Sequence, residues 1–479
     1  MLTTTEMAAP PRPTHRLAPY VLPTLLLGGL ALRLLFMAVG AAFYYKANSP
    51  FSNNDTYSFT QSFMNLWQHG HYSFNPLNPE AAFGRLPGFP FFWGGHYLLF
   101  GEKYVFQAVA FTQCLLDTVA IYLVYATARA LTQDVRAGWV SGLLYAGYPF
   151  VIVWLTMSGS EALATFLTIV VFWWLATRPA TGRNALIAGL LVAVALMVRE
   201  YLGVLLLPVA FWVFSAKGIS LPFVRLGTLA ALGFLVVYIS WPIRNYVFQH
   251  RLVLLKTATA GYDRYAEDVN SARQWVYGWS SDSDPYLDGI AGKAPLPEFP
   301  AEVFATPAEA ARAQQLIRQA RQCGTGFHSW RYNQRYEQPT NCNAELAAGF
   351  EALNASYKQR YPLSYWTRVP FANLKRAVFK SQLKQDAGGG SKVVTILFGY
   401  RSLLILLSLA GAWLLRRRRP TWPVVFFFTF MYLFLCFGIR HLEMRYLLQA
   451  DAALLCLAGA PLMWLFDRLA AQFRTVSAN

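Results

Sequence analysis

Charged side chains are scarce in this chain. Asp, Glu, Lys and Arg make up 14% of its 479 residues, whereas hydrophobic residues make up 55%. Typical soluble domains carry about 25% charged residues, because their surfaces must face water. The shortage therefore excludes an ordinary soluble enzyme and indicates a chain that lies largely within a membrane.

Acidic residues are fewer than basic ones, with 24 Asp and Glu against 41 Lys and Arg. The net charge of +17 could suit nucleic acid, but the basic residues occur in short clusters between apolar runs, as at residues 416–419. Such clusters are typical of the cytoplasmic loops of membrane proteins. We therefore expect membrane lipids as partners and no nucleic acid.

Cysteine is also rare, and no spacing of Cys and His resembles a zinc site. Cys323 and Cys342 both fall in a polar stretch and could form a disulfide if that stretch faces an oxidising compartment. No glycine-rich loop of the type that binds nucleotide phosphates is present, so no nucleotide-sugar site is expected.

Long apolar runs are abundant. A spanning helix needs roughly 20 mostly apolar residues, and the sequence predicts about ten such helices. The first is too long for a signal peptide and is followed by further spans, so it is expected to remain in the protein. The predicted spans are 19–43, 103–128, 136–154, 160–177, 184–199, 201–215, 222–242, 392–415, 421–439 and 446–466.

The basic clusters predict an orientation for these helices. With the amino terminus in the cytoplasm, every cytoplasmic connection carries an excess of Lys and Arg, which is the usual asymmetry. Both termini are then cytoplasmic. The basic residues concerned are Arg12, Arg16, Arg129, Arg136, Arg178, Arg183, Lys217, Arg225, residues 416–419, Arg468 and Arg474.

This orientation predicts three parts. Residues 1–242 form a transmembrane module whose first external loop, 44–102, contains amphipathic stretches expected to be interfacial or re-entrant. Residues 243–391 form an α-rich insert on the same external side, ending at a hinge at Gly388-Gly389-Gly390. Residues 392–479 form a second transmembrane module.

Five short motifs stand out, in this order: Asn53-Asn54-Asp55-Thr56-Tyr57, Arg85-Leu86-Pro87-Gly88-Phe89-Pro90, Ser160-Glu161-Ala162, Trp241-Pro242-Ile243-Arg244-Asn245-Tyr246 and Glu443-Met444-Arg445-Tyr446. In this order they resemble the GT-C glycosyltransferases, which include protein O-mannosyltransferases and the aminoarabinose transferases that act on lipid A. The resemblance implies a GT-C fold and transfer of a sugar, with inversion, from a polyprenyl-phosphate donor to a lipid, glycan or protein acceptor on the non-cytoplasmic face. The style of these motifs indicates a bacterial protein, and therefore a bacterial inner membrane.

Such a transfer needs a group that accepts the proton of the acceptor hydroxyl. Asp55 is the preferred catalytic base, because it lies just beyond the first span on the external side. The structural alternative is a helix cap, since Asp is a favoured capping residue. Glu161 is the second catalytic candidate; it would orient the acceptor or share a divalent metal with Asp55, or else only begin a helix. Many relatives have an acidic pair where this chain has Asp55 followed by Thr56, so the metal is left open.

The departing phosphate needs positive charge placed where negative charge develops. The candidates for binding the donor phosphate are Arg85, Arg199, Arg244 and Arg445, all on the predicted external face. Guanidinium groups bind phosphate oxygens in a bidentate manner, but arginines at helix ends also commonly extend to lipid headgroups. Glu200 would either hold Arg199 in place or pair with it in a turn.

Three further residues are candidates for sugar or proton contacts. His441 could take part in proton transfer, although an interfacial histidine is more often structural. Trp93 and Tyr97 could stack against sugar rings, although aromatic residues also form the belt at a membrane surface.

Charges inside the predicted spans need partners, because a charged side chain at a helix centre costs about 2.5–3.5 kcal/mol on insertion scales. Asp117 lies near the middle of the second span, and Arg33 lies in the outer half of the first. We predict that these two pair and lock two helices together. Arg401 is expected in the outer half of its own span, facing the same cavity.

Two other functions are compatible with a polytopic chain. A transporter or lipid flippase for envelope precursors often has broken helices at mid-membrane, and the short fifth and sixth runs fit that pattern. The external acid and the large insert fit it less well. A non-catalytic scaffold is the third interpretation, in which Asp55 and Arg85 would tolerate substitution.

Overall fold

The computed structural model describes four stretches of the chain, residues 18–45, 50–333, 341–379 and 392–476. Every regular element in these stretches is a helix, which confirms the predicted all-α class. The predicted glycine hinge at 388–390, together with Arg12 and Arg16, lies outside the described residues.

The helices fall into three groups along the chain. Before the insert they are α1 (Ala18–Leu35), α2 (Ala41–Tyr45), α3 (Asn54–His69), α4 (Gly88–Thr132), α5 (Val135–Ala146), α6 (Pro149–Ile152), α7 (Ser160–Thr177), α8 (Gly182–Val198), α9 (Leu206–Lys217), α10 (Leu221–Tyr238) and α11 (Ser240–Gln249). The insert contains α12 (Glu267–Trp279), α13 (Asp284–Ala291), α14 (Pro307–Cys323), α15 (Thr325–Tyr332), α16 (Asn343–Arg360) and α17 (Val369–Phe379). The last group is α18 (Lys392–Leu414), α19 (Trp422–Leu433), α20 (Met444–Leu454) and α21 (Gly459–Val476).

Eight helical segments of the described chain are long and apolar enough to cross a membrane. They are Tyr20–Tyr45, Gly88–Thr132, Ser160–Thr177, Glu200–Lys217, Leu221–Gln249, Thr395–Leu414, Arg419–Ile439 and Met444–Phe473. The other two predicted runs form shorter helices. The run 184–199 becomes α8, and the run 136–154 is divided into α5 and α6 because Pro149 cannot continue a helix through its own nitrogen.

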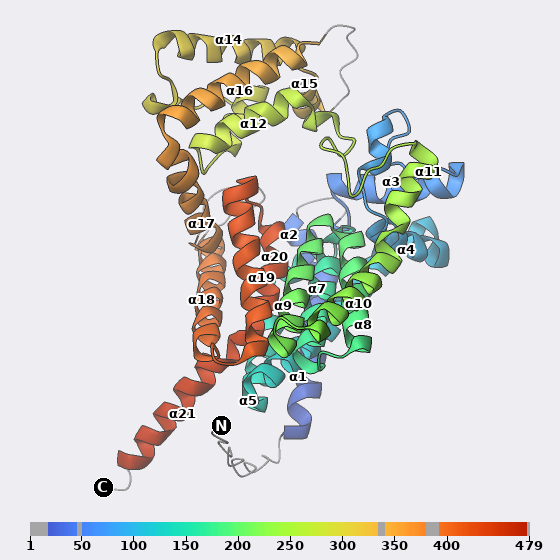
Figure 1. Cartoon of the computed structure of the whole chain (residues 1–479), viewed down its shortest axis with the longest axis vertical. Helices are drawn as coiled ribbons and strands as arrows, with labels where there is room; N and C mark the ends of the chain where they lie inside the picture. The colour runs from blue at the N-terminus through green and yellow to red at the C-terminus, as the bar shows by residue number, and fades with distance from the viewer. Residues whose placement is uncertain (1–17, 46–49, 334–340, 380–391, 477–479) are drawn as a thin grey trace.

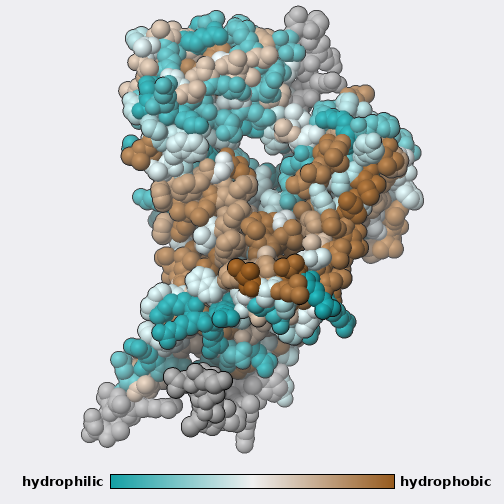
Figure 2. All heavy atoms as spheres, in the orientation of Figure 1, coloured by the Kyte–Doolittle hydropathy of each residue, from teal (hydrophilic) through white to brown (hydrophobic). Residues whose placement is uncertain are grey.

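The layout agrees with a multi-pass membrane protein. In Figure 1 the helices α12, α14, α15 and α16 form a layer beyond one end of the bundle, and the start of α1 and the end of α21 lie at the opposite end. Figure 2 shows a broad band of hydrophobic side chains between hydrophilic ends. Such a band is what a bilayer requires of the surface that faces its hydrocarbon core.

The long helix α4 is two helices joined at a bend. Gly101 has φ 69° and ψ 174°, which are non-helical values inside the continuous assignment. A positive φ favours glycine, because a side chain would clash with the backbone there. The residues before Gly101 belong to the loop 44–102, which the sequence predicts to be external (the first external loop), and those after it match the span predicted at 103–128.

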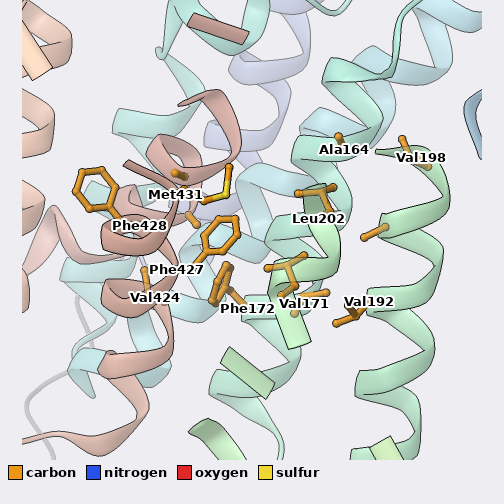
Figure 3. Packing of buried hydrophobic residues seen from close by; sticks show 14 of the residues in the cluster. Ala164, Val171, Phe172, Val192, Val198, Leu202, Val424, Phe427, Phe428 and Met431 are labelled. Carbon is orange, nitrogen blue, oxygen red and sulfur yellow. The ribbon is translucent and has the colours of Figure 1, made fainter. Parts of the chain in front are cut away.

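The core between the spanning helices is aliphatic and aromatic (Figure 3). Phe172 of α7 faces Phe427 of α19, with ring centroids 5.3 Å apart. Val192 of α8 and Leu202 after it pack on the other side of α7. These contacts hold the start of α7 and the residues after α8 in fixed positions, which matters for the site described below.

A buried ion pair joins α1 to α4. Arg33 donates its Nε to Asp117 Oδ2 at 2.6 Å, and both side chains are almost fully buried. Tyr145 of α5 donates its hydroxyl to the other carboxylate oxygen. Arg33 also donates to the carbonyl oxygens of Gly29 and Ala146 at 3.0 and 3.1 Å. The predicted pair is confirmed, and it locks three helices instead of two.

Arg401 does not join that pair. Its Nε lies 2.8 Å from Asp451 Oδ2, so it forms a second buried ion pair, between α18 and α20. Its Nη2 donates to the hydroxyl of Tyr432 in α19 at 2.6 Å. The prediction that Arg401 faces the cavity of the first pair was wrong, because Asp451 provides a nearer carboxylate.

Removing one partner of the first pair should destabilise the bundle strongly. In Asp117→Asn, the charge of Arg33 stays buried without a counterion, and we expect a loss of about 3–5 kcal/mol in the free energy of unfolding. Thermal unfolding in detergent measures it. A suitable control is Asp467→Asn, which breaks the more exposed pair with Arg136 at 2.8 Å and should cost about 0–1 kcal/mol. Equal costs for the two variants would contradict the buried-pair argument.

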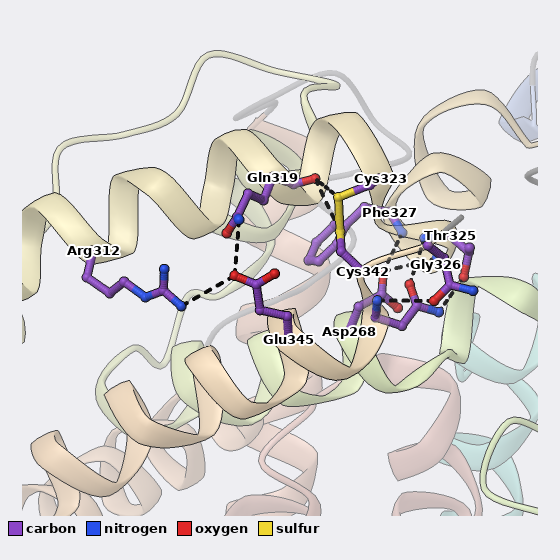
Figure 4. Close-up of a disulfide and its surroundings, with 11 residues drawn as sticks. Asp268, Arg312, Gln319, Cys323, Thr325, Gly326, Phe327, Cys342 and Glu345 are labelled. Carbon is purple, nitrogen blue, oxygen red and sulfur yellow. Dashed lines mark hydrogen bonds and ion pairs between the residues drawn. A yellow bond between two sulfur atoms is a disulfide. The ribbon is translucent and has the colours of Figure 1, made fainter. Parts of the chain in front are cut away.

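The insert has its own core and one covalent link. Cys323 at the end of α14 and Cys342 before α16 form a disulfide, with Cα atoms 5.5 Å apart (Figure 4). The pairing that the sequence left open is therefore present. Beside it, buried Asp268 of α12 accepts hydrogen bonds from the backbone nitrogens of Gly326 and Phe327, at 3.1 and 3.3 Å. The disulfide and these bonds together tie α12, α14, α15 and α16 into one unit.

Candidate active site

A polar cavity of about 90 Å³ lies where five segments of the chain meet. These are α3 of the first external loop, the segment before α4, the start of α7, the residues after α8, and the start of α20. A sixth segment, residues 256–265, completes the lining. Its lining contains five basic residues and two carboxylates. The basic residues are Arg85, Arg199, Lys256, Arg264 and Arg445, and the carboxylates are Asp55 and Glu200.

Asp55 lies in the first turn of α3 without capping that helix. The cap is Asn53, whose Oδ1 accepts hydrogen bonds from the backbone nitrogens of Asp55 and Thr56 at 3.0 and 3.1 Å. Thr56 Oγ1 in turn accepts from the backbone nitrogen of Asn53, which completes a capping box. The capping alternative for Asp55 was therefore wrong, and its carboxylate is available to line the cavity.

Three arginines surround the carboxylate of Asp55. Arg445 forms an ion pair with its Oδ2, and Arg85 and Arg264 lie 3.4 and 3.6 Å from its Oδ1. Burial alone would raise the pKa of Asp55, but the three guanidinium groups, with Arg445 first, outweigh it and hold the pKa well below its usual range. In this state Asp55 is ionised and its charge is neutralised by arginine.

Arg85 is held in place by both loops. Its Nε donates to Ser58 Oγ and its Nη2 to the hydroxyl of Tyr262, each at 2.7 Å. Its guanidinium also lies over the ring of Phe59, 4.0 Å from the centroid. Burial lowers the pKa of Arg85, but Tyr262 and Asp55 raise it by more than burial lowers it. The pKa of Arg85 is therefore above its usual value.

Glu161 forms an ion pair with Arg199, one of the residues that line the cavity. Arg199 Nη2 lies 2.6 Å from Glu161 Oε1, and both side chains are buried. Arg199 also donates to Ser160 Oγ at 2.7 Å and to the hydroxyl of Tyr201 at 2.9 Å. Glu200 neither holds Arg199 nor pairs with it in a turn, which were the two expected roles; it pairs with Lys256 instead.

Arg445 connects the carboxylates of this region. Besides Asp55, its guanidinium forms an ion pair with Glu443 and lies 3.8 Å from Glu161 Oε1. Glu443 also lies 2.8 Å from His441 Nε2. Burial opposes its ionisation, but His441 and Arg445 lower the pKa of Glu443 to about 2. Arg445 is thus held in one orientation by an acid on each side.

A metal shared by Asp55 and Glu161 does not fit this arrangement. The Nη1 of Arg445 contacts both carboxylates, so a guanidinium stands where the shared ion would have to be. Among the described residues, no group of three or more His, Cys, Asp and Glu side chains could hold a metal ion.

Five predicted residues lie outside the cavity lining: Glu161, Arg244, Trp93, Tyr97 and His441. Arg244 donates to the carbonyl oxygens of Tyr72 and Ala82 at 2.6 and 2.9 Å, and so anchors the first external loop. Trp93 is buried and stacks on Tyr97 with centroids 5.5 Å apart, in the hydrophobic core. His441 lies between Glu443 and the hydroxyl of Tyr277, which is 3.1 Å from its Nδ1.

The sequence did not point to several residues of the site. Arg264, Tyr262 and Lys256 come from the start of the insert, which carries no motif of the class. Glu443 lies in a quoted motif, but its role depends on a fold that brings Arg445 beside it. The available signal was local: Tyr262, Arg264 and Tyr265 put a cation between aromatic residues just after a spanning helix.

Comparisons with known proteins agree with this fold. A family model described as dolichyl-phosphate-mannose-protein mannosyltransferase matches residues 84–241, a range that includes Arg85, Glu161 and Arg199 but not Asp55 or Arg445. No curated protein matches the sequence.

Solved structures resemble most of the chain. The archaeal oligosaccharyltransferase AglB from Archaeoglobus fulgidus, in complex with an inhibitory peptide and a dolichol-phosphate, has a TM-score of 0.51 and 13% identity, covering 97% of this chain and 52% of that chain. The Archaeoglobus fulgidus oligosaccharyltransferase in complex with Zn and sulfate has a TM-score of 0.51 and 14% identity, covering 95% and 51%. ArnT from Cupriavidus metallidurans bound to undecaprenyl phosphate has a TM-score of 0.39 and 15% identity, covering 91% and 77%. The chain spans about half the length of the two oligosaccharyltransferase structures. Their likeness confirms the GT-C fold that the motifs predicted.

Proposed function

We propose that the chain is a membrane glycosyltransferase that moves a sugar from a polyprenyl-phosphate donor to a hydroxyl of a lipid, glycan or protein acceptor. The observation that carries the proposal is Asp55, a carboxylate held among three arginines in a polar cavity at the insert side of the bundle. The family match and the dolichol-phosphate in the AglB complex support a lipid phosphate as donor.

The charges of the cavity favour a phosphate. Arg85, Arg264 and Arg445 all contact Asp55, and guanidinium groups bind phosphate oxygens in the same geometry as carboxylate oxygens. A donor phosphate therefore competes with Asp55 for the same cations. As these contacts pass to the phosphate, the pKa of Asp55 rises from its depressed value, and the carboxylate becomes a stronger base once the donor is bound.

The transfer is then a direct displacement with inversion. The acceptor oxygen forms a bond to the anomeric carbon, and the bond from that carbon to the phosphate oxygen breaks. The electron pair leaves with the phosphate, whose growing charge is stabilised by the arginines. The proton of the acceptor hydroxyl passes to Asp55. Glu161 acts by holding Arg199 and Arg445.

The proposed location is a bacterial inner membrane with both termini in the cytoplasm. The disulfide Cys323–Cys342 in the insert supports an oxidising, non-cytoplasmic side for the insert and the cavity beside it. A reporter that is active only in the periplasm is expected to be active when it is fused after Gly390. A reporter that is active only in the cytoplasm is expected to be active when it is fused after Asn479. The reverse pattern would overturn the orientation.

A purified reaction tests the proposed chemistry. Supplying a polyprenyl-phosphate-linked sugar and candidate acceptors in detergent should release free polyprenyl phosphate, detected by mass spectrometry, only when an acceptor is present. A transporter or flippase would leave the donor intact in this assay. Intact donor with all three acceptor classes, from protein shown to be folded, would reject the enzyme.

A further inference from the structure

A second cavity, of about 440 Å³, lies within the insert. Its volume is within the range of about 300–1,000 Å³ that is usual for small-molecule sites. Its lining contains both apolar and basic side chains. The residues that matter for recognition are Gly292, Leu296, Ile317, Arg318, Arg321 and Arg331.

The three arginines of this cavity have no carboxylate partner in the part of the chain that the structure describes. On the same helix, by contrast, Arg312 lies 3.7 Å from Glu345 (Figure 4). All three are exposed to solvent, and three guanidinium groups around one hollow attract an anion to it. The hollow therefore has the charge of an anion site with its counter-charge still to be supplied.

Two of the arginines are held by the fold. Arg321 donates its Nη2 to the carbonyl oxygen of Gly289 at 2.6 Å and its Nε to that of Ile290 at 3.2 Å. Arg331 lies across Gly292, where a Cβ atom would be 3.4 Å from its Cζ. Gly292 ends α13 with φ 77°, a conformation that suits glycine. Guanidinium groups placed in advance lose less freedom when they bind an oxyanion.

The ligand needs an apolar part as well as an anionic one. Leu296 and Ile317 lie in the lining with the arginines, and both also pack in the hydrophobic core of the insert. The insert helices lie beyond the ends of the spanning helices, and α14, which carries Ile317, Arg318 and Arg321, is at the end of the molecule far from the bundle (Figure 1). This position favours a soluble ligand over a lipid headgroup of the same membrane.

We propose that this cavity binds an acidic sugar, a uronate or a phosphate-substituted residue, through Arg318, Arg321 and Arg331. The carboxylate or phosphate contacts the guanidinium groups, and the C–H face of the ring lies against Leu296 and Ile317. The site is separate from the cavity of Asp55, and its binding does not depend on the proposed transfer reaction.

The test measures binding of labelled trigalacturonate to the full-length protein in a neutral detergent. We expect Arg318→Gln combined with Arg331→Gln to weaken binding at least tenfold, while Arg312→Gln, on the same helix but outside the cavity, leaves it unchanged. Arg321 is kept, because it also holds the backbone. Arg318→Glu alone is the second variant, since Arg318 has no contact to lose, and it should weaken binding by a similar factor.

The remaining arms separate other sources of negative charge. Labelled maltotriose, which is neutral, should not bind, and Asp55→Asn should bind trigalacturonate as the wild type does. Unchanged affinity in both arginine variants would overturn the proposal. So would equal binding of maltotriose, tighter binding of hexaglutamate than of trigalacturonate, or binding only to phosphatidylglycerol vesicles.

Discussion

Asp55→Asn is expected to lower kcat by about 10²–10⁴-fold, which is the usual contribution of a general base. Asparagine has nearly the shape of aspartate but cannot accept the proton of the acceptor hydroxyl. Donor binding should be unchanged or tighter, because Arg85, Arg264 and Arg445 no longer have Asp55 to neutralise. Steady-state kinetics with a polyprenyl-phosphate-linked sugar measures kcat. A separate binding measurement with the same donor gives its affinity.

The matched control for this prediction is Glu80→Gln. Glu80 belongs to the same external loop and also pairs with an arginine, Arg251, but it does not line the cavity. We expect wild-type kinetics from it. A wild-type kcat in correctly inserted Asp55→Asn would remove Asp55 from the chemistry, and weaker donor binding would show that its role is structural.

The spanning helices could be predicted because the membrane imposes a simple rule. Inside hydrocarbon every backbone N–H and C=O must be paired within the segment, so an apolar run of sufficient length becomes a helix. The rule is insensitive to breaks inside a run. The run 136–154 satisfied it by composition, but Gly147 and Pro149 divide it, and the shorter pieces remain stable by packing on their neighbours.

The ion pairs show the limit of arguments from proximity in sequence. Arg33 and Asp117 could be matched because each was a charge within a span and needed a partner. Glu200 is next to Arg199 in the chain, yet helix packing places Glu161 beside Arg199 and leaves Glu200 to Lys256. The sequence did not single out Asp451, which is buried within α20, so the partner of Arg401 was not predicted.

The candidate site was predicted in part, and for a physical reason. The orientation derived from the basic loops predicted that five residues share one membrane face, and the structure places them close together. They are Asp55, Arg85, Glu161, Arg199 and Arg445. The depth of each of these side chains at that face, and the direction in which it points, could not be derived from the sequence. Each depends on how the loops fold back over the bundle.

Arg445→Gln should have the second large effect, a fall of about 10²–10³-fold in kcat/KM, as when one charge-stabilising donor is removed from an active site. Among the neighbouring cations, Arg445 lowers the pKa of Asp55 most, so this variant should also raise that pKa toward its usual value. Because Asp55 acts as a base only when ionised, the acid side of the pH–rate profile should move to higher pH. Kinetics at several pH values measure both changes.

Two further variants decide between charge and geometry. Arg445→Lys keeps the charge, but a single ammonium cannot donate to Asp55 and Glu443 from two separate nitrogens as Nη1 and Nε do. We therefore expect it to recover only part of the lost kcat/KM. Arg251→Gln, which removes a more exposed arginine outside the cavity, should be neutral. Full recovery by lysine would mean that Arg445 supplies charge alone, whereas a wild-type kcat/KM in Arg445→Gln would exclude it from the phosphate site. Because Asp55, Glu161 and Glu443 converge on this one guanidinium, its loss is expected to disturb the base and the phosphate site together.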